Sequence, residues 1–316
     1  MDSKDLSVVV QGAISKKHTS LCLKSLRKFL PDSEIILSSW QGSNVSKLDF
    51  DKCILSKDPG GNVCSRDGKG INNCNREIVS TKAGINLATK KFILKIRSDI
   101  ILKNSNILKI NFLNKKRDDR FSFLSDRVLV CSIYSRLFAI KDGNKLPILF
   151  HPSDWIYLGY AEDIKNLFDI PLTQEPEFSL WFKDREQHRN GYVDVHPHRL
   201  WKFAPESYIW ISCLKKYIDI NCEDKLDISD ELIELSKNTL VNNFYMADQP
   251  QLGINLEKYN IIQAMMPKID SDGLYSNFVW QNEYKERCDR NFHVTPTSCE
   301  ILSRIITFFK IKRNRR

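Results

Sequence analysis

The residues with the clearest potential for chemistry follow an apolar run at residues 92–96 and read Arg97, Ser98 and Asp99. A carboxylate at a strand end, beside a small serine, can bind Mg²⁺ or Mn²⁺ together with phosphate oxygens. Such a metal would stabilise the charge that grows on a pyrophosphate leaving group. Alternatively, Asp99 caps the strand or forms a structural ion pair with Arg97, which strand alternation places on the same face.

Other polar residues follow earlier strand-like runs or open a helix. Gln11 and Gly12 follow the first run, and the glycine lets a ligand approach the backbone closely. Asp58 follows the third run and could accept hydrogen bonds from a base or a ribose. Asn75 and Arg76 lie at a helix start, where the arginine fork suits phosphate. Taken alone, each could equally belong to an ordinary turn or surface.

Two acids further along the chain are candidates for a general base towards an acceptor hydroxyl. Asp154 interrupts a strand-like run at 146–159, within the segment HPSDW. His151 and Ser153 are too close to it in one extended run to converge as a catalytic triad. Glu206 is the rival base, although it lies in a first helical turn, where it also favours the helix dipole. If the reaction retains configuration, no separate base is needed and Asp154 would orient the acceptor.

The elements that position these residues alternate between strands and helices. Hydrophobic periodicity predicts strands at 6–14, 34–40, 52–56 and 91–97. Helices are predicted between them, at 18–31 and 71–91. This order predicts an α/β fold with a largely parallel sheet. Ligands of such sheets bind beyond the carboxyl ends of the strands, so we expect Gln11, Asp58 and Asp99 at one edge.

The later part of the chain is less regular. Helices are expected at 104–112, 161–170, 204–217 and 229–244, and strand-like runs at 121–135 and 146–159. Residues 171–200 are aromatic and charged but show little periodicity. We therefore expect a regular N-terminal region followed by a mixed C-terminal third without a clear linker.

Charge and composition limit the possible partners. The chain has 316 residues, a net charge of +9 and no apolar run near the length of about 20 residues that spans a bilayer. The tail at 301–316 holds six basic residues and no acid, so removing those six charges leaves +3. This argues against a broad nucleic-acid surface. The tail suits an interfacial helix on anionic lipid, or it is a frayed, charged terminus.

The cysteines indicate a reducing compartment. There are nine of them, an odd number, and none forms a CxxC pair. No signal peptide is expected at the start, because Met1 leads within a few residues into a strand. We interpret the cysteines as reduced packing residues of a cytosolic protein.

The motifs together resemble the WavE family of lipopolysaccharide-synthesis proteins over about residues 6–215. The segments that carry the resemblance are VVVQGAI, EIILSSWQGS, DPGG, NCNREIVST, KIRSDI, HPSDWIYLG and PESYIW. The resemblance implies a GT-A-like glycosyltransferase that uses a nucleotide-sugar donor, with Gln11, Gly12, Asp58 and Arg76 lining the nucleotide site. A GT-A enzyme carries a DxD motif for metal and pyrophosphate, but here Arg97 stands in place of the first acid, so the arginine could itself neutralise phosphate.

The resemblance also implies an organisation and a set of partners. We expect a GT-A-like catalytic domain at 1–225, with a mixed, mostly parallel sheet flanked by helices, and a helical C-terminal extension at 226–316. The acceptor would be a glycan or lipid-linked precursor of lipopolysaccharide, O-antigen or capsule. The protein would lie on the inner face of the cytoplasmic membrane, held by its basic tail. The alternative is a non-catalytic, membrane-docked scaffold of the assembly machinery.

Overall fold

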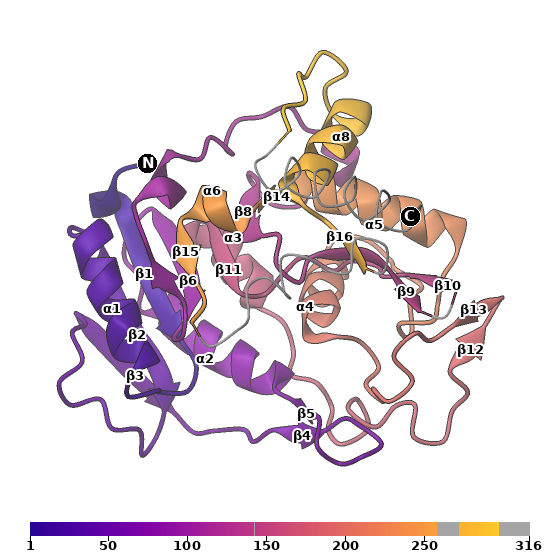
Figure 1. The fold of residues 1–316 in the computed structure, drawn as a ribbon, viewed down its shortest axis with the longest axis horizontal. Helices are drawn as coiled ribbons and strands as arrows, with labels where there is room; N and C mark the ends of the chain where they lie inside the picture. Colours follow the sequence, from indigo (N-terminus) through magenta and orange to yellow (C-terminus); the bar gives the residue numbers. More distant parts are fainter. Residues whose placement is uncertain (142, 258–271, 297–316) are drawn as a thin grey trace, which may run out of the picture.

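The computed structural model describes residues 1–141, 143–257 and 272–296 and is built around a seven-stranded sheet (Figure 1). The strand order is β14-β8-β11-β6-β1-β2-β3. All neighbouring pairs are parallel except those of β11, which runs antiparallel to both β6 and β8. The bounds are β1 Leu6–Gln11, β2 Glu34–Trp40, β3 Lys52–Ser56, β6 Phe92–Arg97, β8 Val128–Cys131, β11 Ile156–Tyr160 and β14 Phe244–Ala247. The predicted mixed, mostly parallel α/β sheet is confirmed.

The central strands are buried on both faces, which explains why they read as continuous apolar runs. In β1, Val8 and Val10 pack into one hydrophobic cluster, whereas Val9 packs into the cluster on the opposite face. In β6, Ile93 faces the same side as Val9. Lys95, two residues further on, therefore points to that side as well.

Helices cover both faces of the sheet, as expected. One face packs against α1 (His18–Phe29), the short helix η2 (Asn106–Lys109) and α6 (Gln249–Leu252). The other face packs against α2 (Cys74–Asn86), α3 (Ala161–Phe168), α4 (Pro205–Leu214), α5 (Asp230–Asn243) and α8 (Asn277–Arg287). Proline at the start of α4 suits the first turn, where no intrahelical N–H partner is lost.

The region after residue 225 contributes to the same sheet. Strand β14 lies beyond the predicted domain boundary and pairs in parallel with β8 at one edge of the sheet (Figure 1). The division at residue 225 stays a prediction. The basic tail at 301–316 lies outside the described residues. Within the part of the chain that the structure describes, no helix is long and apolar enough to cross a membrane.

Smaller elements surround the central sheet. A three-stranded sheet has the order β10-β9-β16, and three further strand pairs are β4–β5, β7–β15 and β12–β13. Their bounds are β4 Asn62–Val63, β5 Ile71–Asn72, β7 Ile101–Leu102, β9 Arg136–Lys141, β10 Asn144–Pro147, β12 His188–Arg189, β13 Tyr192–Val193, β15 Ile254–Asn255 and β16 Asp272–Leu274. The remaining short helices are η1 (Ser3–Asp5) and η3 (Asp119–Phe121).

Candidate active site

A cavity of about 760 Å³ lies at the carboxyl ends of β1 and β6. Asp154 reaches this edge because β11 is antiparallel: its first residue, Ile156, pairs with Ile96 near the end of β6. The cavity brings together nine of the predicted site residues: Gln11, Gly12, Asp58, Arg76, Arg97, Ser98, Asp99, Asp154 and Glu206. It is also lined by residues that were not among the predicted site residues: Trp40, Glu77, Tyr134, Trp155, Arg199 and Trp201.

Asn75 is the predicted site residue that does not line this cavity. Its side chain is buried, and its amide donates to the carbonyl of Thr173 over 3.1 Å. The amide oxygen accepts from the backbone N–H and the hydroxyl of Thr173 at 2.8 and 2.9 Å. Asn75 therefore ties the start of α2 to the segment that follows α3.

The ends of β1 and β6 place backbone and small side chains at the cavity. Gly12 has a φ of 115°, a conformation that residues with a side chain rarely adopt. The hydroxyl of Ser98 donates to the carbonyl of Ala13 over 2.8 Å, and the amide of Gln11 accepts from Ser80 over 2.9 Å. These hydrogen bonds hold the edge in one conformation without a bulky group over it.

Arg97 and Asp99 form a two-pronged ion pair. The guanidinium donates to the two carboxylate oxygens of Asp99 over 3.1 and 2.9 Å and stacks 4.6 Å from the ring centre of Trp155. Asp99 thus offers one carboxylate that a cation already neutralises. Among the described residues, no acidic group that could hold a metal includes Asp99. This donor set does not fit a divalent ion well.

Asp58 and Arg76 form a second pair at the rim of the cavity. Arg76 donates to both carboxylate oxygens over 2.8 and 2.7 Å, and each side chain is about one third exposed. Asp58 also accepts from the backbone N–H of Gly60. The pair therefore links the glycine-rich loop at residues 57–70 to the start of α2.

Arg199 differs from these two arginines. Its guanidinium contacts the sulfur of Cys64 at 3.6 Å and lies 5.1 Å from the ring centre of Trp201. In the described part of the chain, no carboxylate forms an ion pair with it. A side chain at Gly70 would come within 2.5 Å of its Nη1, so the glycine leaves room for the guanidinium. Its segment lacks periodicity, which is why the sequence did not single it out.

A buried lysine joins two acids on the wall of the cavity. Lys95 is fully buried in β6, and its Nζ lies 2.6 Å from Glu77 Oε1. The same ammonium donates to the backbone carbonyl of Asp154. Because an ammonium is costly to bury without a partner, Lys95 in the middle of an apolar strand was a signal for a nearby acid. Sequence reasoning did not use it.

The two acids have opposite pKa shifts. Burial, and then the charge of Asp154, raise the pKa of Glu77 well above its ordinary value. Burial alone would raise the pKa of Asp154 too, but the hydrogen bond with Glu77 and the charges of Lys95 and Arg97 lower it. These shifts favour the protonated form of Glu77, whose carboxyl group donates a hydrogen bond to Asp154, and the ionised form of Asp154. Oδ1 of Asp154 is buried without a hydrogen-bond partner among the described residues.

The other candidate base is neutral. Burial, and then the charge of Asp154, raise the pKa of Glu206 to about 8. Burial, and then Arg136, lower the pKa of His151 to about 4, and its Nε2 lies 3.6 Å from Glu206 Oε2. A general base must be ionised at the working pH. Between the two predicted bases, Asp154 meets this requirement.

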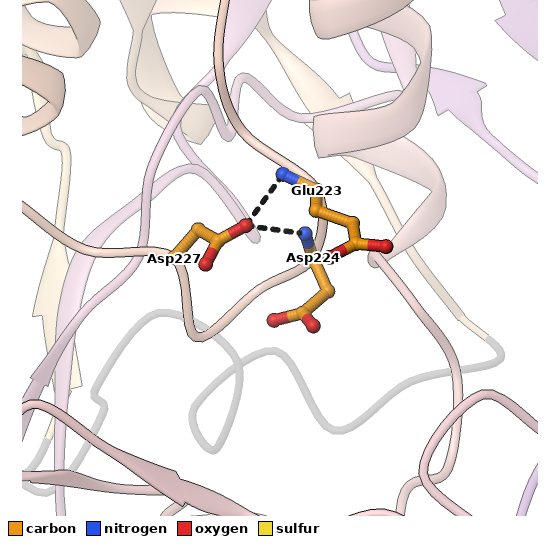
Figure 2. Close-up of side chains that lie close together, drawn as sticks. All are labelled: Glu223, Asp224 and Asp227. Atoms are coloured by element: carbon orange, nitrogen blue, oxygen red, sulfur yellow. Dashed lines mark hydrogen bonds between the residues drawn. The ribbon is translucent and has the colours of Figure 1, made fainter.

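Glu223, Asp224 and Asp227 form the one cluster of potential metal ligands found in the described ranges (Figure 2). Asp227 accepts from the backbone N–H groups of Glu223 and Asp224, as Figure 2 shows. Buried Asp224 accepts from Trp181 Nε1 over 3.0 Å, and Arg189 pairs with both aspartates. These contacts occupy the carboxylates of Asp224 and Asp227, which gives those two residues a structural role.

Three comparisons relate the chain to known proteins. A family model described as WavE lipopolysaccharide synthesis matches residues 6–313, well beyond the predicted end of the resemblance near residue 215. No protein with a curated function matches. Among solved structures, the chain is similar to one described as the crystal structure of S. aureus TarS, at 16% identity and a TM-score of 0.30. That match covers 55% of this chain and 30% of the TarS chain, so it spans less than a third of its length.

Proposed function

Because the chain belongs to the WavE lipopolysaccharide synthesis family, we propose that it is a glycosyltransferase with a GT-A-like catalytic domain. It transfers a sugar from a nucleotide-sugar donor to a growing bacterial surface glycan. The observation that carries this proposal is the carboxylate of Asp154, whose lowered pKa favours the ionised form and which lines the same cavity as the predicted donor residues.

The donor lies over the ends of β1 and β6, where Gly12 permits close approach of the backbone. Trp40, at the end of β2, offers an aromatic face to the base. Arg199 binds the diphosphate, because no acid among the described residues pairs with its guanidinium, which suits two-pronged recognition of phosphate. Because Arg97 already forms an ion pair with Asp99, it contributes less to binding of the diphosphate.

Asp154 acts as the base of an inverting transfer. The acceptor hydroxyl gives its proton to the carboxylate of Asp154 while its oxygen bonds to the anomeric carbon of the donor sugar. The bond from that carbon to the diphosphate breaks, and the electron pair leaves with the nucleotide diphosphate. Arg199 stabilises the charge that develops on the leaving group. The hydrogen bond from Glu77 and the ammonium of Lys95 hold Asp154 in place.

No step of this mechanism depends on a divalent ion. A metal at Asp99 would have to share that carboxylate with Arg97. The predicted role of Asp99 as a metal ligand therefore gives way to a positioning role in our proposal, with Asp99 fixing Arg97 beneath the donor.

The finer assignments extend the same proposal. The product belongs to lipopolysaccharide, O-antigen or capsule, and the enzyme works at the inner face of the cytoplasmic membrane. The basic residues at 301–316 would bind anionic lipid there. Deleting this segment should move the protein from the membrane fraction to the soluble fraction.

The proposal is tested by screening nucleotide sugars for thermal stabilisation of the full chain, with and without Mn²⁺. At least one donor should raise the melting temperature, and the same donor should be hydrolysed slowly in the absence of acceptor. A complete lack of response across uridine, guanosine, cytidine and thymidine donors would contradict it.

A scaffold without catalysis is the second candidate. It is favoured by the Arg97–Asp99 pair, which leaves the DxD position without a free acid. Donor hydrolysis decides between the two functions, because a scaffold binds partners but does not cleave a nucleotide sugar.

A further inference from the structure

A second cavity, of about 480 Å³, lies next to the first one. Four residues line both cavities: Tyr134, Arg199, Trp201 and Glu206. The two spaces are therefore neighbours, and Glu206 lies where they meet. Of the residues given a role in binding the donor, Arg199 alone lines this second cavity.

The second cavity has mostly apolar walls, which come from the β9–β10 hairpin and from the segment that leads into α4. Its apolar lining includes Ala139, Leu146, Ile148, Leu149, Val195 and Phe203. Three of these, Ala139, Leu146 and Val195, belong to a hydrophobic cluster and are at most 5% exposed. An apolar group that entered this space would lose its contact with water at little cost to the walls.

The charges along these walls largely satisfy one another. Asp194 pairs with Lys225 at 2.6 Å, and Asp224 is held by Arg189. His151 also lines the cavity and is 7% exposed, and its Nε2 lies 3.6 Å from Glu206 Oε2. These two side chains offer a polar contact for a ligand hydroxyl.

The lining combines polar and apolar residues, which indicates the kind of ligand. Glu206 lines both cavities and lies 3.6 Å from His151, and Trp201 lines both cavities as well and adds an aromatic side chain. A sugar ring offers hydroxyls for hydrogen bonds and C–H groups for contact with an aromatic face. The apolar residues of the walls suit an alkyl or acyl group.

We propose that the second cavity is the acceptor site and that it takes an amphiphilic glycoside. The apolar group lies between Ala139, Leu146 and Phe203, and a sugar hydroxyl lies at His151 and Glu206, directed towards Asp154. This inference rests on the proposed transferase function and adds the class of acceptor to it.

The test compares methyl and n-octyl glycosides of glucose, galactose and mannose, below their micellar concentrations, on the full chain with donor diphosphate bound. Because the octyl group buries more apolar surface, at least one octyl glycoside should bind about tenfold or more tightly than its methyl partner. Ala139→Phe, which fills the cavity, should remove this advantage. Ile148→Glu, which places a charge in the wall, should also remove the advantage. It replaces Ala139→Phe in the test if that variant folds poorly.

Ala83→Phe is the matched control, because Ala83 is a half-buried alanine of α2 that lines neither cavity. It should keep the preference for octyl glycosides. Because neither Ala139 nor Ile148 lines the donor cavity, every variant should still be stabilised by the nucleotide sugar, and this is measured for each of them.

The outcomes separate the two proposals. If the donor binds normally but Ala139→Phe and Ile148→Glu both keep the octyl preference, the acceptor site lies elsewhere and the transferase function stands. The acceptor assignment is likewise overturned if wild type shows no octyl preference. If no nucleotide sugar binds, the transferase function fails, and the acceptor assignment fails with it.

Discussion

Lys95 Nζ lies 2.6 Å from Glu77 Oε1, which places an ammonium between the core of the sheet and the wall of the candidate active site. The lysine is fully buried and also lies 5.4 Å from the ring centre of Tyr157. Its charge favours the ionised form of the neighbouring Asp154. Together with the hydrogen bond from Glu77, a charge deep in the fold thereby lowers the pKa of a group that lines the candidate active site.

Asp154→Asn should remove the general base. An amide cannot take up the acceptor proton, so transfer should fall by about 10²–10⁴-fold. Binding of the nucleotide sugar should change little, as measured by thermal stabilisation. Asp169→Asn is the control, because Asp169 is an exposed acid that pairs with Lys82 at the surface and does not line the cavity. Substantial transfer by Asp154→Asn would remove Asp154 from the mechanism.

Glu77→Gln should keep much of the activity, whereas Glu77→Leu should lose it. The amide of glutamine donates a hydrogen bond to Asp154, as the protonated Glu77 does, but leucine donates none. The acidic limb of the pH–rate profile should move to higher pH in the leucine variant, because the pKa of Asp154 rises when the donor is lost. Equal activity of both variants would show that the hydrogen bond has no role.

Arg199→Ala should weaken binding of nucleoside diphosphates by about tenfold or more, because charge-assisted hydrogen bonds to phosphate are lost. Binding of the nucleoside, which has no phosphate, should not change. Gly70→Val should act in the same direction, since a side chain there would collide with the guanidinium. Arg185→Ala serves as control, because Arg185 stacks on Trp181 outside the donor cavity. Calorimetric titration provides the comparison.

Glu206→Gln should flatten the pH dependence of stability. The folded pKa of Glu206 is about 8, above the value of about 4.3 for an unfolded glutamate. The stability that its neutral form contributes is fully present below the unfolded pKa and is lost as pH rises through the folded one. Wild type should therefore lose more stability than the variant between pH 5 and 9, by about 2 kcal/mol or more. Parallel denaturation curves would contradict this.

Removal of divalent ions tests the charge at the DxD position. With EDTA present, wild type should keep most of its donor binding, because arginines rather than a metal face the diphosphate. Arg97→Asp should introduce dependence on Mn²⁺, since it supplies a second carboxylate beside Asp99. Complete loss of wild-type donor binding in EDTA, restored by Mn²⁺, would instead support the predicted metal ligand.

Most of the regular structure could be predicted from periodicity. The strands at 34–40 and 52–56 were located without error, and the helices around residues 18 and 205 follow from their apolar spacing and from Pro205. The edge that gathers Gln11 and Asp99 was also predictable, because parallel strands end on one side. Local sequence carries these features, so no distant contact was needed to infer them.

The sequence by itself determined an α/β protein with its polar strand ends on one edge. The reason is that the hydrophobic periodicity and the order of strands and helices depend on residues that are close together in the chain. Only the tertiary structure decided which of those residues work together. The antiparallel direction of β11 turns Asp154 towards Arg97, and the fold brings Glu77 to Lys95 and Arg199 to the loop at Gly70. Protonation followed from the same contacts, since burial and neighbouring charge, rather than residue type, set the pKa values of Glu77, Asp154 and Glu206.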